Sequence, residues 1–348
     1  MNAKNIEVLV TLGPASLSED VVSKCVALGV SIFRINLSHT SLDDLESTIT
    51  KIRSWTDVPI CLDSEGAQLR NQVMSGGEIY FDTGNDIRIP FSPVTGSKTE
   101  ISFTPTKMAS QFQPGDRIRI DFDGAEFEVN HRMADHCLAT VINPGFVGSN
   151  KAADLNRPIE FDPLTTKDVA AIEIGHACGI KNFALSFTNR PQDVIQMRAA
   201  CGPDANIICK IESKEGVRNL DAILDEADAI LIDRGDLSRQ IKLQKIPAFQ
   251  RRIISTANGR AKPVYVATNL LESMIQKASP SRAEVNDVVS TLMMGADGLV
   301  LAAETAIGKY PVQAVEMIRL LIDEATTWDP EASLEDLLEE PLSRPSSQ

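Results

Sequence analysis

Eight short runs of hydrophobic residues, rich in Val and Ile, recur along the chain, and a polar or Gly-containing turn closes each of them. The runs cover residues 7–10, 31–35, 59–62, 182–186, 207–211, 229–232, 264–267 and 298–301. The segments between them place apolar residues at helical spacing, as in 18–28 behind the capping residue Ser18 and in 282–294. Strand and helix therefore alternate, which predicts a parallel sheet, and eight such units predict an α/β fold of the (β/α)8 TIM barrel type.

One connection is much longer than the others. About a hundred residues separate the third strand from the fourth, whereas a usual connection holds one helix and a few loop residues. Gly and Pro turns punctuate short alternating runs in this stretch, such as 117–122, which is typical of a small antiparallel β domain. We therefore predict a barrel formed by 1–67 and 156–328, with a small β-barrel-like domain, 68–155, inserted between strand 3 and helix 3. Residues 329–348 are acidic and contain Pro and Ser, and we expect them to form a disordered tail.

The composition argues against several classes of protein. The formal net charge is −14, and no run of Lys or Arg is interleaved with aromatic residues, so nucleic acid is not an expected partner. No apolar run reaches the length of a membrane span, and we see no apolar signal-peptide core at the start of the chain. The six cysteines form no Cys-x-x-Cys pair, which favours a reduced compartment. We expect a cytoplasmic enzyme that acts on a small molecule.

Charged residues gather where the predicted strands end. Lys210 and Glu212 lie two residues apart at the end of the fifth strand, so their side chains point to the same face. In a barrel of this type the carboxyl ends of all strands meet at one rim, which carries the active site. Glu212 and Asp236 offer the carboxylate oxygens that Mg²⁺ or Mn²⁺ prefers, and Lys210 then faces an anionic substrate. Gly235 and Asp236 also begin a helix, whose free N–H groups favour an anionic group.

Each of these residues also has a structural explanation. Lys210 and Glu212, taken alone, are equally well explained as a buried ion pair, and His39 fits a surface or capping histidine better than a catalyst. What favours a site is that the chemistry of six strand ends converges. The other polar residues at those ends are Arg34, Asn36, Ser38, Asp63, Ser64, Glu65, Arg234, Thr268, Glu304 and Thr305.

Seven motifs, in order along the chain, resemble those of the pyruvate kinase family. They occupy residues 11–16, 34–39, 210–216, 234–237, 267–274, 282–287 and 304–311. The resemblance extends from about residue 6 to residue 318. It implies transfer of a phosphoryl group from phosphoenolpyruvate to ADP, followed by protonation of the enolate to pyruvate. Such a transfer depends on positioning and on charge neutralisation by cations, which agrees with the residues found at the rim.

The resemblance also implies roles for individual residues. Glu212 and Asp236 would hold Mg²⁺, and Lys210 would stabilise charge on the transferring phosphoryl group. Thr268 would contact the substrate carboxylate or assist protonation, helped by the backbone at Gly235.

Two further groups of residues follow from the same resemblance. A monovalent cation, K⁺, would bind Asn36, Ser38, Asp63 and Ser64. The phosphates of ADP or ATP would face Arg34, His39, Arg70 and Lys151, and Arg34 would also count among the catalytic residues. The inserted domain would be a lid that excludes water.

Three departures from the family pattern bear on the activity. Glu65 stands where the family has Lys, and Gln68 where it has Glu, so a charge beside the expected phosphates is reversed. A like charge within a few ångströms of a triphosphate costs about 1 kcal/mol or more. Asn189 replaces an Arg after the fourth strand, and further changes follow the Arg-Gly-Asp-Leu motif at Ser238, Arg239 and Gln240. The third departure is that the chain ends where the family's C-terminal domain begins. We therefore expect no allosteric regulation through that domain, and any assembly to be a homodimer through the barrel.

Three hypotheses follow. The first is a pyruvate kinase-like phosphotransferase that uses Mg²⁺, K⁺, phosphoenolpyruvate and ADP without a regulatory C-terminal domain. The second is a lyase, decarboxylase or transferase that uses Mg²⁺ to stabilise an enolate of pyruvate, oxaloacetate or another 2-oxo acid without ADP, which the changes at Glu65 and Gln68 favour. The third is a non-catalytic relative. Nucleotide binding separates the first hypothesis from the others, and Mg²⁺ binding separates the first two from the third.

Overall fold

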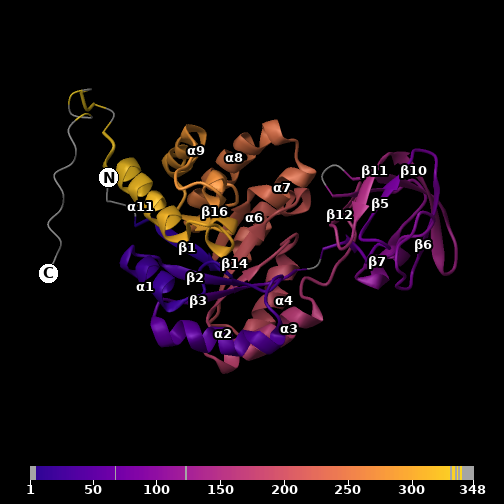
Figure 1. Ribbon diagram of the computed structural model, residues 1–348, viewed down its shortest axis with the longest axis horizontal. Coiled ribbons are helices and arrows are strands. Elements are labelled where there is room, and N and C mark those ends of the chain that lie inside the picture. Colours follow the sequence, from indigo (N-terminus) through magenta and orange to yellow (C-terminus); the bar gives the residue numbers. More distant parts are fainter. Residues whose placement is uncertain are drawn as a thin grey trace.

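Eight parallel strands close into a barrel, as the strand–helix alternation predicts (Figure 1). The computed structural model describes residues 5–66, 68–121, 124–329, 331–333, 335 and 338. The barrel strands are β1 (Glu7–Leu12), β2 (Ile32–Asn36), β3 (Ile60–Asp63), β13 (Asn182–Leu185), β14 (Asn206–Ile211), β15 (Ala229–Asp233), β16 (Val264–Ala267) and β17 (Gly298–Leu301). Their order around the barrel is β1-β17-β16-β15-β14-β13-β3-β2, so neighbours in the chain are neighbours in the wall.

Helices surround the barrel, and polar side chains cap several of them. Their bounds are α1 (Glu19–Ala27), α2 (Leu42–Trp55), α3 (Thr166–Ala177), α4 (Pro191–Cys201), α5 (Lys214–Arg218), α6 (Leu220–Glu226), α7 (Arg234–Gln240), α8 (Ile246–Gly259), α9 (Arg282–Met293), α10 (Ala303–Ala306) and α11 (Pro311–Thr327). Ser18 caps α1, as expected from the sequence, and the capping box of Ser281 and Glu284 begins α9. The apolar helix faces pack against the outward-facing residues of the strands and form the main core.

A separate layer of side chains fills the barrel interior. Leu9, Cys61, Leu231 and Val300 belong to this layer and are nearly fully buried. Tyr265 also belongs to it, and its hydroxyl donates a hydrogen bond to the Glu7 carboxylate. The strand between them carries Gly298, where an added Cβ would lie 2.7 Å from the Tyr265 ring. The absence of a side chain at Gly298 therefore leaves space for the Tyr265 ring to cross β17 and reach Glu7.

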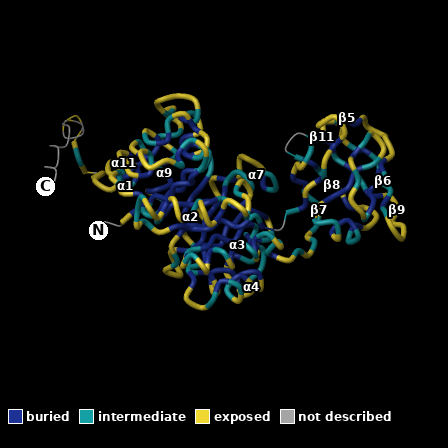
Figure 2. Tube along the Cα trace, turned by 60° about the horizontal axis from the view of Figure 1, so that its bottom comes forward, coloured by how far each residue is buried: buried dark blue, intermediate teal, exposed yellow. Residues whose placement is uncertain are grey.

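Residues 68–155, which we call the inserted segment, leave the barrel after β3 and return before α3. The strands here are β4 (Arg70–Asn71), β5 (Glu78–Phe81), β6 (Asp86–Pro90), β7 (Phe103–Thr104), β8 (Arg117–Ile120), β9 (Glu126–Arg132), β10 (His136–Asn143), β11 (Gly145–Gly148) and β12 (Ala153–Leu155). Five of them form an antiparallel sheet in the order β12-β8-β9-β10-β6. The segment has its own buried cluster, apart from the barrel core, as the dark interior of each lobe in Figure 2 shows. Within it, the edge-to-face pair of Phe81 and Phe127 has ring centroids 5.5 Å apart.

Two predictions from the sequence concern residues that the structure does not describe in full. The proposed boundary between barrel and insertion includes residue 67, which lies outside the described residues. The proposed tail, 329–348, is described only at 329, 331–333, 335 and 338, so its disorder stays a prediction. Within the described part of the chain, no helix is both long enough and apolar enough to cross a membrane.

Candidate active site

Lys210 and Glu212 meet at the carboxyl end of β14, as their spacing predicts. Lys210 Nζ lies 3.1 Å from Glu212 Oε1 and 3.3 Å from Asp63 Oδ1, which comes from the end of β3. The ammonium also donates a 3.0 Å hydrogen bond to Ser186 Oγ. All four side chains are buried, with Lys210 7% exposed and Glu212 1% exposed. Charged groups are rarely buried to this extent without partners, and here the partners come from three neighbouring strand ends.

The surroundings of Lys210 keep it protonated. Burial opposes the charge of the ammonium, but the attraction of Asp63, Glu212 and Asp233 outweighs it, so the pKa of Lys210 is raised above its ordinary value. A permanently cationic group is therefore held at the mouth of the barrel.

Arg34 provides a second buried cation beside the first. Its guanidinium donates to Asp63 Oδ2 at 2.9 Å and, through Nε, to Thr11 Oγ1 at 2.9 Å. Asp63 thus contacts both Arg34 and Lys210, and it holds the two cations close together. The structure therefore brings together the sequence-predicted residues Arg34, Asp63, Lys210 and Glu212.

Three carboxylates converge next to Lys210. Glu212, Asp233 and Asp236 each offer an oxygen, and these oxygens lie within 4.8 Å of one another. Burial raises the pKa of Glu212 to about 8, although Lys210 opposes the shift, and repulsion by Asp233 and Asp236 adds to it. The pKa of Asp236 is raised for the same reasons, by burial and then by Asp233. A divalent cation would relieve both the burial penalty and the repulsion.

The two oxygens of Glu212 differ in their hydrogen bonding. Oε2 accepts a 2.6 Å hydrogen bond from the Phe187 N–H. Oε1 is buried and accepts no hydrogen bond within the described part of the chain, and the Lys210 ammonium at 3.1 Å is its ionic partner. Hard oxygen donors of this kind suit Mg²⁺ or Mn²⁺. The donor set therefore fits the metal that the sequence predicts at Glu212 and Asp236.

Asp233 is the residue of this cluster that the sequence reasoning missed. It ends β15 and also acts as the N-cap of α7, where its Oδ1 accepts a 3.4 Å hydrogen bond from the Asp236 N–H. An Asp before a helix is usually explained as a cap, so its chemical role is hidden. Its position directly before Arg234-Gly235-Asp236 is the signal that could have revealed it.

Thr268 and Gly235 lie side by side above the ends of β15 and β16. The Gly235 N–H donates a 2.8 Å hydrogen bond to Thr268 Oγ1, and the hydroxyl donates to the Ala267 carbonyl at 2.6 Å. Thr268 has a φ of 69°, which is unusual for a β-branched residue. The guanidinium of Arg234 donates to the Thr268 carbonyl at 2.7 Å and pairs with Asp287 at 2.6 Å, so it helps hold this conformation.

The four residues predicted to bind K⁺ lie at or just after the ends of the neighbouring strands β2 and β3, and internal contacts engage oxygens of Asn36, Asp63 and Ser64. Asn36 and Asp63 are register partners on β2 and β3. Asn36 Oδ1 accepts a 2.9 Å hydrogen bond from the Ser38 N–H, and Ser64 Oγ accepts one of 2.9 Å from the Ser186 N–H. The Asp63 carboxylate already contacts Arg34 and Lys210. This group stays a prediction.

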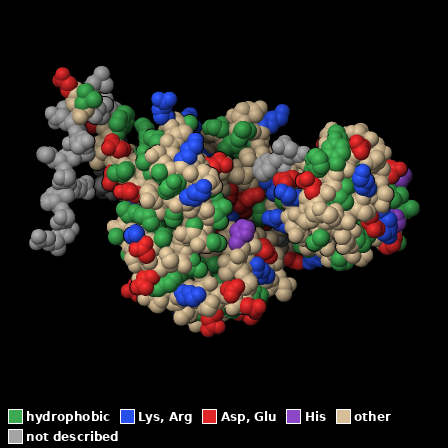
Figure 3. Space-filling model, viewed as in Figure 1, with side chains coloured by type: hydrophobic (Ala, Val, Ile, Leu, Met, Phe, Trp, Pro, Cys, Tyr) green, Lys and Arg blue, Asp and Glu red, His purple; other side chains and the backbone are tan. Residues whose placement is uncertain are grey.

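The residues predicted to face nucleotide phosphates come from the barrel and from the inserted segment. His39 is exposed beyond β2. Arg70 donates a 3.0 Å hydrogen bond to the Asn150 carbonyl, and burial together with the nearby charge of Arg239 lowers its pKa. Lys151 pairs with Asp121 at 2.9 Å. Figure 3 shows basic and acidic side chains gathered where the barrel faces the inserted segment.

The residues that depart from the family pattern have specific contacts. Glu65 Oε1 lies 3.5 Å from Lys167 Nζ, which partly offsets the reversed charge. Its N–H donates to Asp168 at 2.7 Å, so the backbone at this turn is fixed. Asn189 accepts a hydrogen bond from the Ser213 hydroxyl beside Glu212. Gln68 lines a cleft between the barrel and the inserted segment.

Comparisons with known proteins agree with this geometry. The family model described as pyruvate kinase, barrel domain, matches residues 3–315. The chain is 33% identical over 325 residues to the pyruvate kinase of Mycobacterium tuberculosis, covering 91% of this chain and 69% of that protein. It is 34% identical over 322 residues to the pyruvate kinase of Thermoplasma acidophilum, with 91% and 57% covered. It is also 34% identical over 325 residues to that of Geobacillus stearothermophilus, with 90% and 55% covered, so it spans little more than half of these two relatives. On the strength of this match and of the rim chemistry, the chain belongs to the pyruvate kinase family.

Proposed function

We propose that the protein transfers a phosphoryl group from phosphoenolpyruvate to ADP, giving pyruvate and ATP, with Mg²⁺ and K⁺ as cofactors. The observation that carries this proposal is the buried Lys210, which lies 3.1 Å from Glu212 Oε1 within a cluster of three carboxylates. The C-terminal rim of the barrel, where these groups lie, is where enzymes of this fold bind their substrates.

Glu212, Asp233 and Asp236 would hold the divalent cation. The raised pKa values of Glu212 and Asp236, and the Glu212 oxygen that accepts no hydrogen bond within the described residues, support this assignment. When bound, Mg²⁺ or Mn²⁺ supplies positive charge to the substrate oxygens during transfer.

Lys210 and Arg34 would neutralise the charge of the phosphoryl group. Asp63 holds both cations in place before the substrate binds, so little reorganisation is needed during the reaction. The ion pairs with Asp63 offset the free-energy cost of burying these two cations in the folded protein. When the substrate binds, contacts with its phosphate oxygens would replace some of these ion-pair contacts.

The Gly235 N–H and the Thr268 hydroxyl would bind the substrate carboxylate. They are 2.8 Å apart, and the Arg234 contact to the Thr268 carbonyl helps hold the threonine in place. The N–H now donates to the hydroxyl and the hydroxyl to the Ala267 carbonyl, so both donors would exchange these bonds for contacts with the substrate carboxylate. The Thr268 hydroxyl is also the candidate that assists protonation of the enolate, since it already takes part in a chain of hydrogen bonds.

ADP would bind toward the inserted segment. His39, Arg70 and Lys151 would face its phosphates, and the inserted segment would act as a lid that excludes water. K⁺ would bind near Asn36, Ser38, Asp63 and Ser64. K⁺ and the basic residues that face the nucleotide would together complete the neutralisation of charge on the transferred phosphate.

A second candidate function is Mg²⁺-dependent enolate chemistry on a 2-oxo acid without ADP. Glu65 favours it, because its carboxylate replaces a cation on the side where nucleotide phosphates would lie and is only partly offset by Lys167. The metal cluster, Lys210 and Thr268 are sufficient to stabilise an enolate.

Pyruvate release from phosphoenolpyruvate, measured with Mg²⁺ and K⁺ and with or without ADP, separates the two functions. ADP-dependent release is expected for the phosphotransferase. Bound Mg²⁺ without ADP-dependent release would reject it, and turnover of oxaloacetate or another 2-oxo acid would then support the second function.

A further inference from the structure

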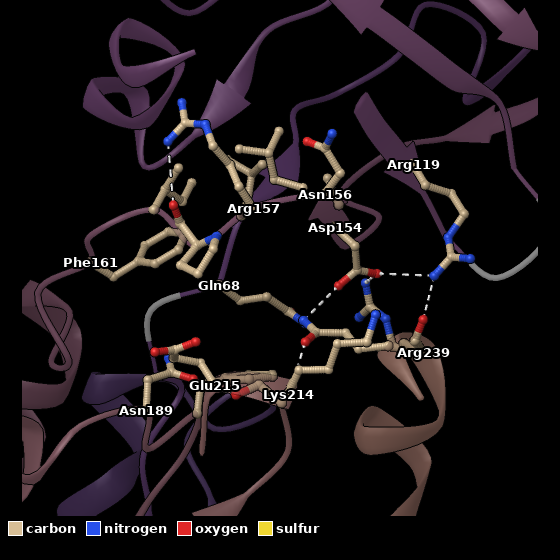
Figure 4. A pocket seen from close by; sticks show the side chains of 18 of the residues that line it. Gln68, Arg119, Asp154, Asn156, Arg157, Phe161, Asn189, Lys214, Glu215 and Arg239 are labelled. Carbon is tan, nitrogen blue, oxygen red and sulfur yellow. Dashed lines mark hydrogen bonds and ion pairs between the residues drawn. The ribbon is translucent and has the colours of Figure 1, made fainter. Parts of the chain in front are cut away.

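A cleft of about 580 Å³ lies between the barrel and strands β8 and β12 of the inserted segment (Figure 4). Its barrel side consists of residues that follow β13, β14 and β15, and its other side consists of residues around β8 and β12. Among the described residues, eight Lys and Arg residues line it, against four Asp and Glu residues. This surplus of positive charge stands out in a chain whose formal net charge is −14.

Several cations of the cleft form ion pairs with carboxylates, whereas two lysines form no such pair within the described residues. Arg157 binds Asp116 through two nitrogens, at 2.7 and 2.8 Å, and Arg218 pairs with Glu215 at 3.1 Å. Within the described residues, no carboxylate lies within 4.0 Å of the ammonium groups of Lys214 and Lys242. These two exposed lysines therefore carry much of the unbalanced positive charge.

The cleft also has an apolar wall. Leu155, Ile159 and Phe161 line it from the returning chain, and Phe187 and Ile241 line it from the barrel. Small-molecule sites commonly combine such walls with a few charged groups in volumes of roughly 300–1,000 Å³. The cleft has both properties, and they select a ligand with an apolar body and an anionic group.

We propose that this cleft is a second binding site, for a small organic anion that carries a phosphate or a carboxylate. Lys210, Glu212, Asp236 and Thr268 are absent from the described residues that line it, so the cleft borders the candidate active site without including these four residues. The proposal does not depend on the reaction proposed above, because it concerns binding alone.

Asp154 of β12 connects the cleft to the carboxylate cluster. Its carboxylate lies 3.0 Å from Arg239 and accepts a 3.1 Å hydrogen bond from Gln240. Arg239 also lies 3.5 Å from Asp236, and Arg119 lies 4.0 Å from Asp154. An anion in the cleft competes with Asp154 for the two arginines. Its binding therefore weakens the attachment of the inserted segment and changes the charge balance at Asp236.

The test measures binding of phenyl phosphate to the full chain by calorimetry, at low ionic strength and without metal or nucleotide. Saturable binding is expected, and the double variant Lys214→Gln/Lys242→Gln should bind at least about tenfold more weakly. The matched control is Lys51→Gln/Lys245→Gln, which makes the same charge change at exposed lysines outside the cleft and should bind like the wild type. The proposal would be overturned if phenyl phosphate did not bind, or if both double variants weakened binding equally. It would also be overturned if Lys214→Gln/Lys242→Gln still bound phenyl phosphate normally while Lys210→Met did not.

Two further probes define the ligand. Inorganic phosphate should bind more weakly than phenyl phosphate, because it makes no contact with the apolar wall. Benzoate should bind if a carboxylate suffices, whereas its failure beside bound phenyl phosphate assigns the site to phosphates. Equal affinities for inorganic and phenyl phosphate would reject the apolar part of the proposal.

The connection through Asp154 has its own measurement. Mn²⁺ affinity, followed by electron paramagnetic resonance, should shift at least about twofold when phenyl phosphate saturates the cleft. The shift should disappear in Lys214→Gln/Lys242→Gln. An unchanged Mn²⁺ affinity in the wild type would reject the coupling.

Discussion

Lys210 Nζ lies 3.1 Å from Glu212 Oε1, and both side chains are almost completely buried at the mouth of the barrel. One ammonium thus partly compensates a cluster that contains three carboxylates, Glu212, Asp233 and Asp236. The remaining negative charge favours a cation, whereas Lys210 and Arg34 favour an anion close by. The charges of the site therefore suit a cation and an anion side by side, as the proposed function requires.

Replacing Lys210 by Met should lower turnover by at least about 10²–10³-fold, because it removes positive charge from the transition state. The folded structure should persist, since Met keeps most of the aliphatic volume and Glu212 can take up a proton once the ammonium is gone. Steady-state kinetics and thermal unfolding measure the two effects. Lys51→Met, at an exposed position on α2, is the control, and turnover in Lys210→Met equal to that of the control would exclude the proposed role.

Glu65→Lys should strengthen ADP binding. The change replaces repulsion by attraction on the side of the nucleotide phosphates, and about 1 kcal/mol corresponds to roughly a fivefold lower Kd. Lys167, 3.5 Å from Glu65, loses its partner but remains near the site as a second cation. Titration with ADP measures the effect, and Glu65→Gln should give an intermediate value. An unchanged or higher Kd would contradict the explanation of this departure.

Asp233→Asn separates the two roles of this residue. Asn is as good an N-cap as Asp, so α7 should form as before and thermal stability should be unchanged or higher. The loss of one charge should weaken Mn²⁺ binding at least about tenfold. Asp20→Asn, at an exposed position in the first turn of α1, makes the same charge change outside the cluster and should bind Mn²⁺ normally. If Asp233→Asn also binds Mn²⁺ normally, Asp233 serves as a cap alone.

Tyr265→Phe should change how stability depends on pH. Burial, and then the hydrogen bond to Glu7, raise the pKa of Tyr265 above its ordinary value of 10.0. The stability that the neutral hydroxyl contributes is therefore complete below pH 10 and is lost as the pH rises above it. Tyr265→Phe should be about 1 kcal/mol less stable at pH 8, yet its free energy of unfolding should fall less between pH 9 and 11. Urea unfolding at these pH values provides the measurement, and parallel declines would refute the prediction.

Periodicity in the sequence predicts the barrel and the core of the site. Lys210 and Glu212 share a face because alternate residues of a strand do so, and the closed barrel brings them to the same rim as Arg34 and Asp63. These are consequences of regular geometry. They need no knowledge of the loops.

Other parts of the site depend on contacts that no local pattern reveals. Asp154 and Arg239 are 85 residues apart in the chain and meet only because the inserted segment folds back onto α7. Asp233 was missed because its backbone-capping role explains an Asp at that position equally well. The pairing of Glu65 with Lys167 likewise depends on where the turn after β3 faces the start of α3.

Strand β13 is hydrogen-bonded directly to β3, with Asn182 opposite Cys61 and Ala184 opposite Asp63, although the inserted segment separates the two strands in the chain. The barrel wall is therefore continuous where the segment departs and returns. The two lobes also have separate buried cores. The inserted segment can therefore change in length and sequence without breaking a strand pair of the barrel. Ligand preference can diverge through such changes while the barrel itself stays the same.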